Sequence, residues 1–414
     1  MSLAENVDYL RRLRKLNAFA DFAAHAAAHA RNIRPVVRSP LHEVIRFGTN
    51  PGNLRMFAFV PANLQYPRAL VVVLHGCGQT AAGYDLGAGW STLAKRYGFA
   101  VLLPEQQVVN NANTCFNWFN PDDISRGSGE ACSIRQMIAR MVADHGIDQR
   151  RIFITGLSAG GAMTSVMLAN YPELFAGGAI IAGLPFGVAS NVREALRGMR
   201  SSPARPAHEL GDLVRNAAHH KGRWPRISVW HGSADRTVNP GNANEIVKQW
   251  LDVHDLPPAP MSEGTVDGHP HQIWWDGEGE TIVESYTITD MAHGTPLGVA
   301  DNDERYGVQG AFLIEAGISS SYHIAKFFGL TAWIREQKKS AAQKPHVDSP
   351  SAKLIPTVSP IAAPASLPIP DISKVLWPQA PLPPRPEPKR KRSRHAIDVG
   401  AVITRALTAA GLRK

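Results

Sequence analysis

Cysteine is scarce in this sequence, with only Cys77, Cys115 and Cys132 among 414 residues. An odd and low count gives no framework of disulfides. Cys115 and Cys132 are close enough in sequence to bridge across a loop, whereas in a reducing compartment the thiols would stay free. The sequence leaves both alternatives open, and we interpret the Cys77 side chain as a small buried thiol without a chemical role.

Long apolar runs are also missing. No stretch of 18 apolar residues occurs, so we expect no transmembrane helix. The first 35 residues carry Arg11, Arg12, Arg14 and Lys15, followed by Ala- and His-rich sequence instead of an apolar segment with a cleavage site. We therefore expect a cytoplasmic protein, with an extracellular location as the alternative.

Acidic residues are few at the C-terminal end. Residues 385–414 hold nine Lys or Arg and two acids, which accounts for most of the formal net charge of +9. Residues 341–388 hold 13 of the 31 prolines, which predicts an extended linker. We divide the chain into an N-terminal helical extension (1–40), a central domain (41–335) that we expect to be near neutral, a Pro-rich linker (336–388) and a basic tail (389–414).

The basic tail resembles segments that contact an anionic membrane, the surface of a storage granule or nucleic acid. Trp377 is the only aromatic residue in 341–414, so stacking on bases has little support and nucleic acid is a poor candidate partner. A solvated charged extension is the plain alternative.

Short apolar runs alternate with helical segments through the central domain. This alternation is typical of buried parallel strands with helices on both faces. The predicted strands are 70–74, 99–103, 151–155, 179–182 and 227–230, and the predicted helices lie around 90–97, 132–145, 159–170 and 242–253. Residues 272–288 predict a hairpin whose second arm is the last strand of the sheet, followed by a helix near 319–328. The sequence therefore predicts an α/β fold of the α/β-hydrolase type with a mostly parallel central sheet.

Residues 156–160 read Gly-Leu-Ser-Ala-Gly and match the pattern G-x-S-x-G. A predicted strand comes directly before them and a predicted helix directly after. A serine on such a sharp turn needs small neighbours, which Gly156 and Gly160 supply, and a helix N-terminus favours developing negative charge. This context predicts Ser158 as a nucleophile; the alternative is a Gly-rich turn in a non-catalytic α/β protein.

A serine that attacks a carbonyl group needs two N–H donors for the oxyanion that forms. One is expected from Ala159, the residue after the nucleophile, and one from a loop after an earlier strand. Residues 74–79 read Leu-His-Gly-Cys-Gly-Gln and follow such a strand, which makes the backbone N–H of Cys77 the second candidate. We interpret His75 as structural, because it comes too early for the usual order of the acid and the base.

In this fold type the acid follows the nucleophile and the histidine comes last. Asp235 follows the predicted strand 227–230 and is the candidate acid, with an Asx turn or a helix cap as the alternative. His293 lies in a predicted loop after the hairpin and is the candidate base. Asp290 is a weaker rival for the acid, because it is too near His293 in sequence to face the far nitrogen of its ring.

Four segments taken together resemble the polyhydroxybutyrate depolymerase-type esterases, a family related to feruloyl and acetylxylan esterases. They are residues 74–79, 156–163, 231–235 (His-Gly-Ser-Ala-Asp) and 293–296 (His-Gly-Thr-Pro), and residues 114–119 are similar to a further family segment. The resemblance covers roughly residues 45–330. It implies a catalytic triad of Ser158, Asp235 and His293, with Cys77 and Ala159 as oxyanion donors.

The resemblance also implies a substrate class. We expect hydrolysis of poly- or oligo-3-hydroxybutyrate-type esters through an acyl-enzyme, a reaction that needs no metal or cofactor. The runner-up is a feruloyl or acetylxylan-type carbohydrate esterase, and the alternative from another class is a non-catalytic binding protein on a hydrolase scaffold. Trp118 and Phe119 are predicted to line the acyl pocket, since aromatic side chains build apolar ester sites; ordinary core positions are the alternative.

Overall fold

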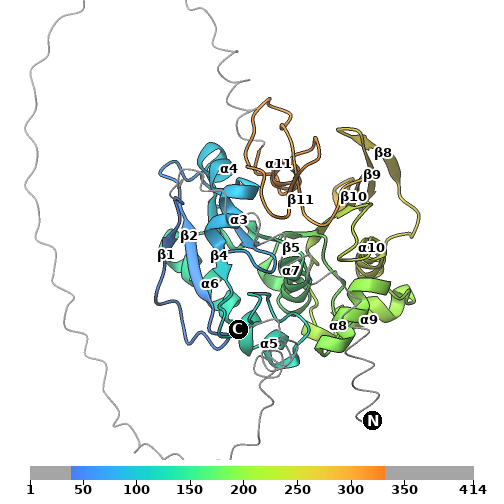
Figure 1. Ribbon diagram of the computed structural model, residues 1–414, viewed down its shortest axis with the longest axis horizontal. Helices are drawn as coiled ribbons and strands as arrows, with labels where there is room; N and C mark the ends of the chain where they lie inside the picture. The colour runs from blue at the N-terminus through green and yellow to red at the C-terminus, as the bar shows by residue number, and fades with distance from the viewer. Residues whose placement is uncertain (1–38, 332–414) are drawn as a thin grey trace, which may run out of the picture. The chain divides into compact units, whose positions relative to one another are not determined.

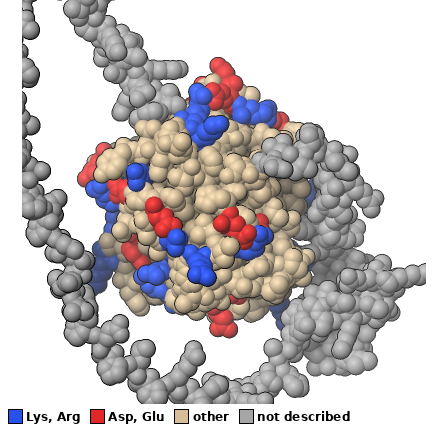
Figure 2. All heavy atoms as spheres, turned by 90° about the vertical axis from the view of Figure 1, so that its left-hand side faces the viewer, with Lys and Arg blue, Asp and Glu red and all other residues tan. Residues whose placement is uncertain are grey.

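The computed structural model describes residues 39–331 (Figure 1). The predicted N-terminal extension, Pro-rich linker and basic tail lie outside these residues, except for residues 39 and 40. Within 39–331, no helix combines the length and the apolar character that crossing a membrane requires. The same residues carry 22 Lys or Arg against 27 Asp or Glu, a small acidic excess for a domain of this size. Figure 2 shows both signs of charge intermixed on one face.

Ten strands of the described chain form one sheet in the order β1-β2-β4-β3-β5-β6-β7-β10-β9-β8. The strands from β4 to β10 in this order pair in parallel, and antiparallel strands extend both edges. The carboxyl ends of the parallel strands therefore meet at one edge of the sheet, where ligands bind in open α/β sheets. The strands are β1 His42–Glu43, β2 Arg55–Phe59, β3 Leu70–Leu74, β4 Ala100–Glu105, β5 Ile152–Leu157, β6 Gly177–Ile181, β7 Arg226–Gly232, β8 Ser262–Val266, β9 His269–Trp275 and β10 Thr281–Ile288; a separate parallel pair consists of β11 Thr295–Leu297 and β12 Leu313–Glu315.

The strand β3 shows how the sheet divides the core. All five of its residues are buried. Leu70, Val72 and Leu74 belong to one hydrophobic cluster, whereas Val71 and Val73 belong to another. Because successive side chains of a strand point to opposite faces, the two clusters are the two faces of the sheet, and both are covered.

Helices cover both faces of the sheet (Figure 1). Side chains of α6, α7 and α10 pack in the first cluster, and side chains of α3, α4 and α11 pack in the second. The helix α9 packs on α7 and α10. The helices are α3 Ala81–Ala88, α4 Trp90–Tyr97, α5 Pro121–Ile124, α6 Gly129–His145, α7 Ala159–Asn170, α8 Val192–Ser201, α9 Ala207–Ala218, α10 Gly241–Val253 and α11 Ser320–Phe327, with 3-10 turns at Gln149–Arg151 and Pro172–Leu174.

The predicted α/β-hydrolase architecture is confirmed. The five predicted strands correspond to β3, β4, β5, β6 and β7, and the predicted hairpin is β9 and β10, whose second arm pairs in parallel with β7. The final helix is α11. Helices α8 and α9 between β6 and β7, and the edge strand β8, were not predicted.

Candidate active site

Ser158 lies between β5 and α7 with φ 56° and ψ −115°. Such a backbone is strained for a residue with a Cβ atom and persists only where the surroundings fix it. Its N–H donates to the carbonyl of Ile181 at 2.9 Å, and its carbonyl accepts from the N–H of Ala162 at 2.8 Å. A Cβ atom on Gly156 would lie 2.4 Å from the Gly160 oxygen, and one on Gly160 would lie 2.4 Å from the Leu74 oxygen. The two glycines therefore admit the turn, as the sequence predicted.

The side chains of Ser158, His293 and Asp235 form a continuous chain of hydrogen bonds. His293 Nδ1 lies 2.7 Å from Asp235 Oδ2, and His293 Nε2 lies 2.9 Å from Ser158 Oγ. A carboxylate only accepts, so Nδ1 carries the proton and the lone pair of Nε2 faces the serine hydroxyl. All three side chains are buried. The structure thus brings together the three residues that the sequence singled out, and it leaves the rival Asp290 outside this chain.

Asp235 lies in the turn after β7 and has a full set of donors. Its Oδ1 accepts from the backbone N–H groups of Thr237 at 2.8 Å and Val238 at 2.9 Å. Its Oδ2 lies 2.7 Å from His293 Nδ1 and 3.1 Å from His231 Nε2. Burial opposes ionisation, but the hydrogen bonds from His231 and His293 outweigh it and hold the pKa of Asp235 well below its ordinary value. The carboxylate therefore stays charged at any pH at which an esterase works.

Sequence reasoning missed His231 as a member of this site. It lies in β7, four residues before Asp235, within the segment 231–235 that carries part of the family resemblance. Its contact with Asp235 depends on the turn that brings residue 235 back toward the end of the strand. The signal in the sequence was the spacing of a histidine and an aspartate across a predicted strand end.

The loop after β3 contains the predicted oxyanion donor. Within residues 39–331, the backbone N–H groups of Cys77 and Ala159 donate to no protein acceptor. The Gln106 N–H donates to His75 Nε2 at 3.1 Å, so the Nδ1–H of His75 donates to the Gly76 carbonyl at 2.8 Å. The N–H and C=O of a trans peptide point in opposite directions, so this bond directs the N–H of Cys77 away from His75. Burial lowers the pKa of His75 to about 4, which keeps the ring neutral and structural as predicted.

The cysteine predictions were wrong. Cys77 and Cys115 form a disulfide, and Cys132 is a buried free thiol. The side chain of Cys77 is therefore a covalent link between the loop after β3 and the loop after β4, and not a thiol without a role. Cys132 lies in α6 and is not part of the disulfide.

A buried carboxyl group holds the loop that carries Cys115. Glu130 accepts from the side-chain amides of Gln106 at 2.6 Å and Asn117 at 2.7 Å, and from the Asn117 N–H at 2.8 Å. Burial and the charge of Asp123 raise the pKa of Glu130 to about 8, against the effect of these hydrogen bonds. The loop that carries Cys115 thus rests on a polar network that sequence reasoning did not find.

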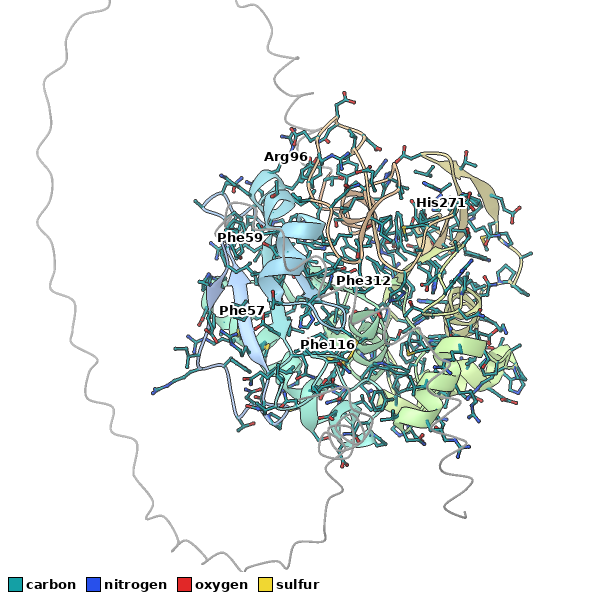
Figure 3. All side chains as sticks on the ribbon, viewed as in Figure 1. Phe57, Phe59, Arg96, Phe116, His271 and Phe312 are labelled. Atoms are coloured by element: carbon teal, nitrogen blue, oxygen red, sulfur yellow. A yellow bond between two sulfur atoms is a disulfide. The ribbon has the colours of Figure 1, made fainter. Side chains whose placement is uncertain are left out.

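Aromatic rings flank the two sides of the site. Phe116 lies 5.0 Å from the His75 ring and Phe312 lies 6.0 Å from the His293 ring, between ring centroids (Figure 3). Trp118 is buried in the hydrophobic cluster of α6 and α7, with Phe119 packed edge-on against it at 5.5 Å. The predicted role of Trp118 and Phe119 in an acyl pocket stays a prediction.

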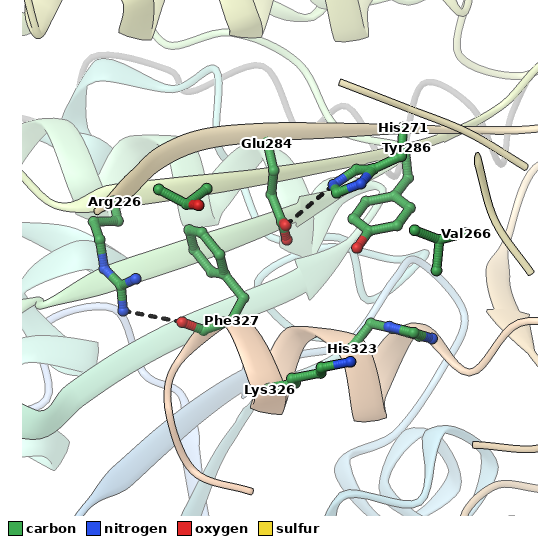
Figure 4. A pocket seen from close by; sticks show the side chains of 9 residues that line it. Arg226, Val266, His271, Glu284, Tyr286, His323, Lys326 and Phe327 are labelled. Atoms are coloured by element: carbon green, nitrogen blue, oxygen red, sulfur yellow. Dashed lines mark hydrogen bonds and ion pairs between the residues drawn. The ribbon is translucent and has the colours of Figure 1, made fainter. Parts of the chain in front are cut away.

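A separate cavity of about 380 Å³ lies among β7, β9, β10 and α11 (Figure 4). None of its lining residues belongs to the hydrogen-bonded chain of Ser158. Its charged groups have partners within the described chain: Arg226 pairs with Glu280, His271 with Glu284, and Lys326 with Asp301. Beside this cavity, three side chains hold atoms that could ligate a metal ion within 4.8 Å of one another: Asp267, Asp301 and His323. His323 bonds Asp267 at 3.0 Å and Lys326 bonds Asp301 at 2.7 Å, so this group is already satisfied without an ion.

Known proteins resemble this chain over the described fold. The family model described as "Esterase PHB depolymerase" matches residues 56–260, which include Ser158 and Asp235 and end before His293. Poly(3-hydroxyalkanoate) depolymerase C of Paucimonas lemoignei is 46% identical over 291 residues, or 70% of each chain. Feruloyl esterase B of Neurospora crassa is 32% identical over 62% of this chain and 88% of its own.

A solved structure agrees with these relatives. Acetyl xylan esterase from Aspergillus awamori matches with a TM-score of 0.58 and 26% identity, over 70% of this chain and 99% of its own. Identity of this extent to the depolymerase shows common descent, and the fold and the ordered motifs agree with it. The chain therefore belongs to the polyhydroxybutyrate depolymerase-type esterases, α/β-hydrolases that cleave carboxylic esters.

Proposed function

We propose that this esterase hydrolyses short-chain hydroxyalkanoate esters of the poly- or oligo-3-hydroxybutyrate type, with Ser158, His293 and Asp235 as its catalytic triad. The observation that carries the proposal is the unbroken chain from Ser158 Oγ to His293 Nε2 at 2.9 Å and from His293 Nδ1 to Asp235 Oδ2 at 2.7 Å. Nucleophile, base and orienting acid within hydrogen-bond reach are the signature of an activated serine. The same hydrogen-bonded series of side chains argues against a non-catalytic binding protein, which would not need an activated serine.

The reaction follows from the positions of the protons. His293 Nε2 takes the hydroxyl proton as Ser158 Oγ attacks the ester carbonyl, and Asp235 stabilises the imidazolium. The N–H groups of Cys77 and Ala159 hold the oxyanion. The tetrahedral intermediate collapses, the C–O bond to the alcohol breaks, and His293 returns the proton to the leaving oxygen. Water activated by His293 then attacks the acyl-enzyme and releases the acid and the free serine.

The substrate class rests on the relatives. Poly(3-hydroxyalkanoate) depolymerase C is 46% identical to this chain over 291 aligned residues, whereas an acetylxylan and a feruloyl esterase are 29% and 32% identical over their alignments. Trp118 and Phe119 are proposed to border the acyl group through the loop that follows Cys115. The carbohydrate esterases are the second candidate, favoured by the match to the solved acetyl xylan esterase.

Replacing the nucleophile tests the mechanism. Ser158→Ala is expected to abolish hydrolysis of p-nitrophenyl butyrate, because no other group in the proposed chain can form the acyl-enzyme. Ser262→Ala is the matched control, since Ser262 is exposed on β8. Hydrolysis by Ser158→Ala at the rate of the parent would refute the mechanism.

A substrate comparison tests the specificity. Rates of release from 3-hydroxybutyrate oligomers, methyl ferulate and acetylated xylan are measured under one condition. We expect the highest kcat/KM for the oligomers. A higher value for methyl ferulate or acetylated xylan would assign the chain to the runner-up class while leaving the triad intact.

The disulfide bears on where the protein works. Disulfides persist in oxidising compartments and are rare in the cytoplasm. The Cys77–Cys115 bond therefore favours the extracellular alternative over the cytoplasmic one that the sequence suggested, and we propose an oxidising site of action. Thiol labelling of protein taken from cells and from medium tests this: one reactive thiol after unfolding indicates the disulfide, and three indicate a cytoplasmic, reduced protein.

A further inference from the structure

His231 has an unusual hydrogen-bonding state. Its Nε2 lies 3.1 Å from Asp235 Oδ2 and 3.0 Å from the carbonyl oxygen of Val238. Both oxygens only accept, so Nε2 carries a proton; it donates to the Val238 carbonyl and lies within ion-pair distance of Asp235 Oδ2. Its Nδ1 is buried and has no partner among the described residues.

A buried imidazole with an unpartnered nitrogen is unfavourable at a position that serves only packing. A buried polar atom without a partner costs free energy, and native proteins keep few of them. His231 is only 3% exposed, near the end of a strand whose other buried positions on the same face, Ile227 and Val229, are apolar. The imidazole is best explained by what its Nε2–H does for Asp235.

The geometry points to His231 as a positioning residue for Asp235, an inference that rests on the proposed triad. The backbone N–H groups of Thr237 and Val238 hold Oδ1, and His231 Nε2, bonded to the Val238 carbonyl, lies 3.1 Å from Oδ2. With these contacts the carboxylate is fixed in rotation before His293 reaches it. His231 thus presents Oδ2 to His293 Nδ1 at 2.7 Å.

The expected kinetic effect is on the chemical step. His231 bonds Asp235 and not Ser158, so it acts on the reaction only through the carboxylate. The His293 imidazolium that Asp235 stabilises exists only after Ser158 has lost its proton. Loss of an interaction made mainly in the transition state lowers kcat and leaves KM unchanged.

A matched pair of variants of the full chain tests the inference. His231→Gln keeps an N–H donor at about the position of Nε2, whereas His231→Met has similar length and no donor. We expect His231→Met to lose roughly tenfold in kcat with KM unchanged, as for one lost hydrogen bond to a charged group, and His231→Gln to retain most of kcat. Equal losses in both variants, or no loss in either, would overturn the inference and leave only a packing role.

A measurement without turnover separates this inference from the proposed function. The strongly deshielded proton between His293 and Asp235 is followed by nuclear magnetic resonance in the parent and both variants. Its resonance is expected to move in His231→Met and to keep its position in His231→Gln; no movement in the Met variant contradicts the inference. If His231→Met does not fold, His231→Leu takes its place in both measurements. Activity remaining in Ser158→Ala would instead remove the proposed triad, whatever the resonance does.

Discussion

Asp235 is held by groups within four residues of it in sequence, whereas Cys77 is held by groups from distant parts of the chain. His231, Thr237 and Val238 supply three of the four contacts on the Asp235 carboxylate. The loop of Cys77 is tied by the disulfide to Cys115 and by the N–H of Gly78, which donates to the Asn113 carbonyl at 2.8 Å. Farther along the chain, Gln79 donates to the Ala311 carbonyl at 3.2 Å.

The two sides of the site therefore respond to different conditions. On the acid–base side, which consists of Asp235 and His293, the Asp235 carboxylate is held mainly by its own turn, and only the bond to His293 comes from a distant part of the chain. The proposed oxyanion side, which consists of Cys77 and the loops after β3 and β4, is held by a disulfide and by buried polar groups. A change that damages one side is therefore expected to leave the contacts of the other side in place.

Asp235→Asn is expected to give the largest effect, confined to the acid–base side. The neutral amide cannot stabilise the imidazolium and cannot accept from both histidines as the carboxylate does. We expect kcat to fall by about 10³ to 10⁴, with KM nearly unchanged. Steady-state kinetics on p-nitrophenyl butyrate measure this, with Asp255→Asn as the exposed control. A loss below tenfold would mean that Asp235 does not orient the base.

Sequence reasoning found residues that lie in recognisable motifs, and it missed partners that no motif marks, whether near in sequence, as His231 is to Asp235, or distant, as Cys115 is to Cys77. The turn at residues 156–160 that carries Ser158 can be recognised from five residues, and so can the position of Asp235 after a strand end. The order of the strands in the sheet then brings both residues to one edge. The partner of Cys77 is not written in any one segment. It follows from β3 and β4 lying side by side in parallel, so that the loops after them meet, whereas proximity in sequence suggested Cys115 and Cys132.

The helices α8 and α9 escaped prediction for a related reason. Each is mostly polar outside a narrow buried stripe: only Ala195 and Gly198 of α8, and Leu210, Gly211 and Val214 of α9, are buried. Such helices are stabilised by what they pack on more than by their own apolar pattern. The Glu130 network was missed because a glutamate on a helix usually faces solvent, and nothing in its sequence neighbours shows the amides that reach it.

Gly160→Ala tests the point at which the two sides meet. A Cβ atom there would lie 2.4 Å from the Leu74 oxygen and 2.5 Å from the His75 oxygen, so α7 would be pushed away from the oxyanion loop. Backbone atoms cannot yield as a flexible side chain would, and we expect a loss of about 4 kcal/mol in the free energy of unfolding.

The control for Gly160→Ala is Gly277→Ala. No atom lies within 4 Å of a Cβ added at Gly277, so its free energy of unfolding should stay within about 0.5 kcal/mol of the parent. Urea denaturation of both variants decides. Equal free energies of unfolding would show that the turn at Ser158 accommodates a Cβ atom at residue 160, against this prediction.

Cys115→Ala loosens the oxyanion side alone. The disulfide closes a loop with a sequence separation of 38 residues, and its loss is expected to lower the free energy of unfolding by about 3 kcal/mol. Because the Cys77 N–H then loses a restraint, kcat should also fall, while the Asp235 contacts persist. Cys132→Ala removes a thiol that forms no disulfide and should leave kcat unchanged. A parent-like kcat in Cys115→Ala would separate the disulfide from the oxyanion hole.

Mild acid is expected to weaken the oxyanion side before the acid–base side. The folded-state pKa of His75 is about 4, below its ordinary value of 6.5, so the unfolded chain binds the proton more readily. The stability that His75 contributes is full above pH 6.5 and is lost as the pH falls toward 4, with about 2 kcal/mol gone by pH 5. Asp235 has a lowered pKa, so its contribution persists above pH 3.8 and is lost only at lower pH.

Urea denaturation at pH 7, 6 and 5 measures the His75 effect in the parent and in His75→Asn, which keeps a donor for the Gly76 carbonyl but does not titrate. His254, whose pKa burial also lowers to about 4, is present in both proteins and cancels in the comparison. The parent is expected to lose about 2 kcal/mol more than the variant between pH 7 and pH 5. If the free energies of unfolding of the parent and of His75→Asn depend on pH in the same way, His75 takes up its proton without disturbing the loop after β3. The contrast between the two sides would then depend on the disulfide alone.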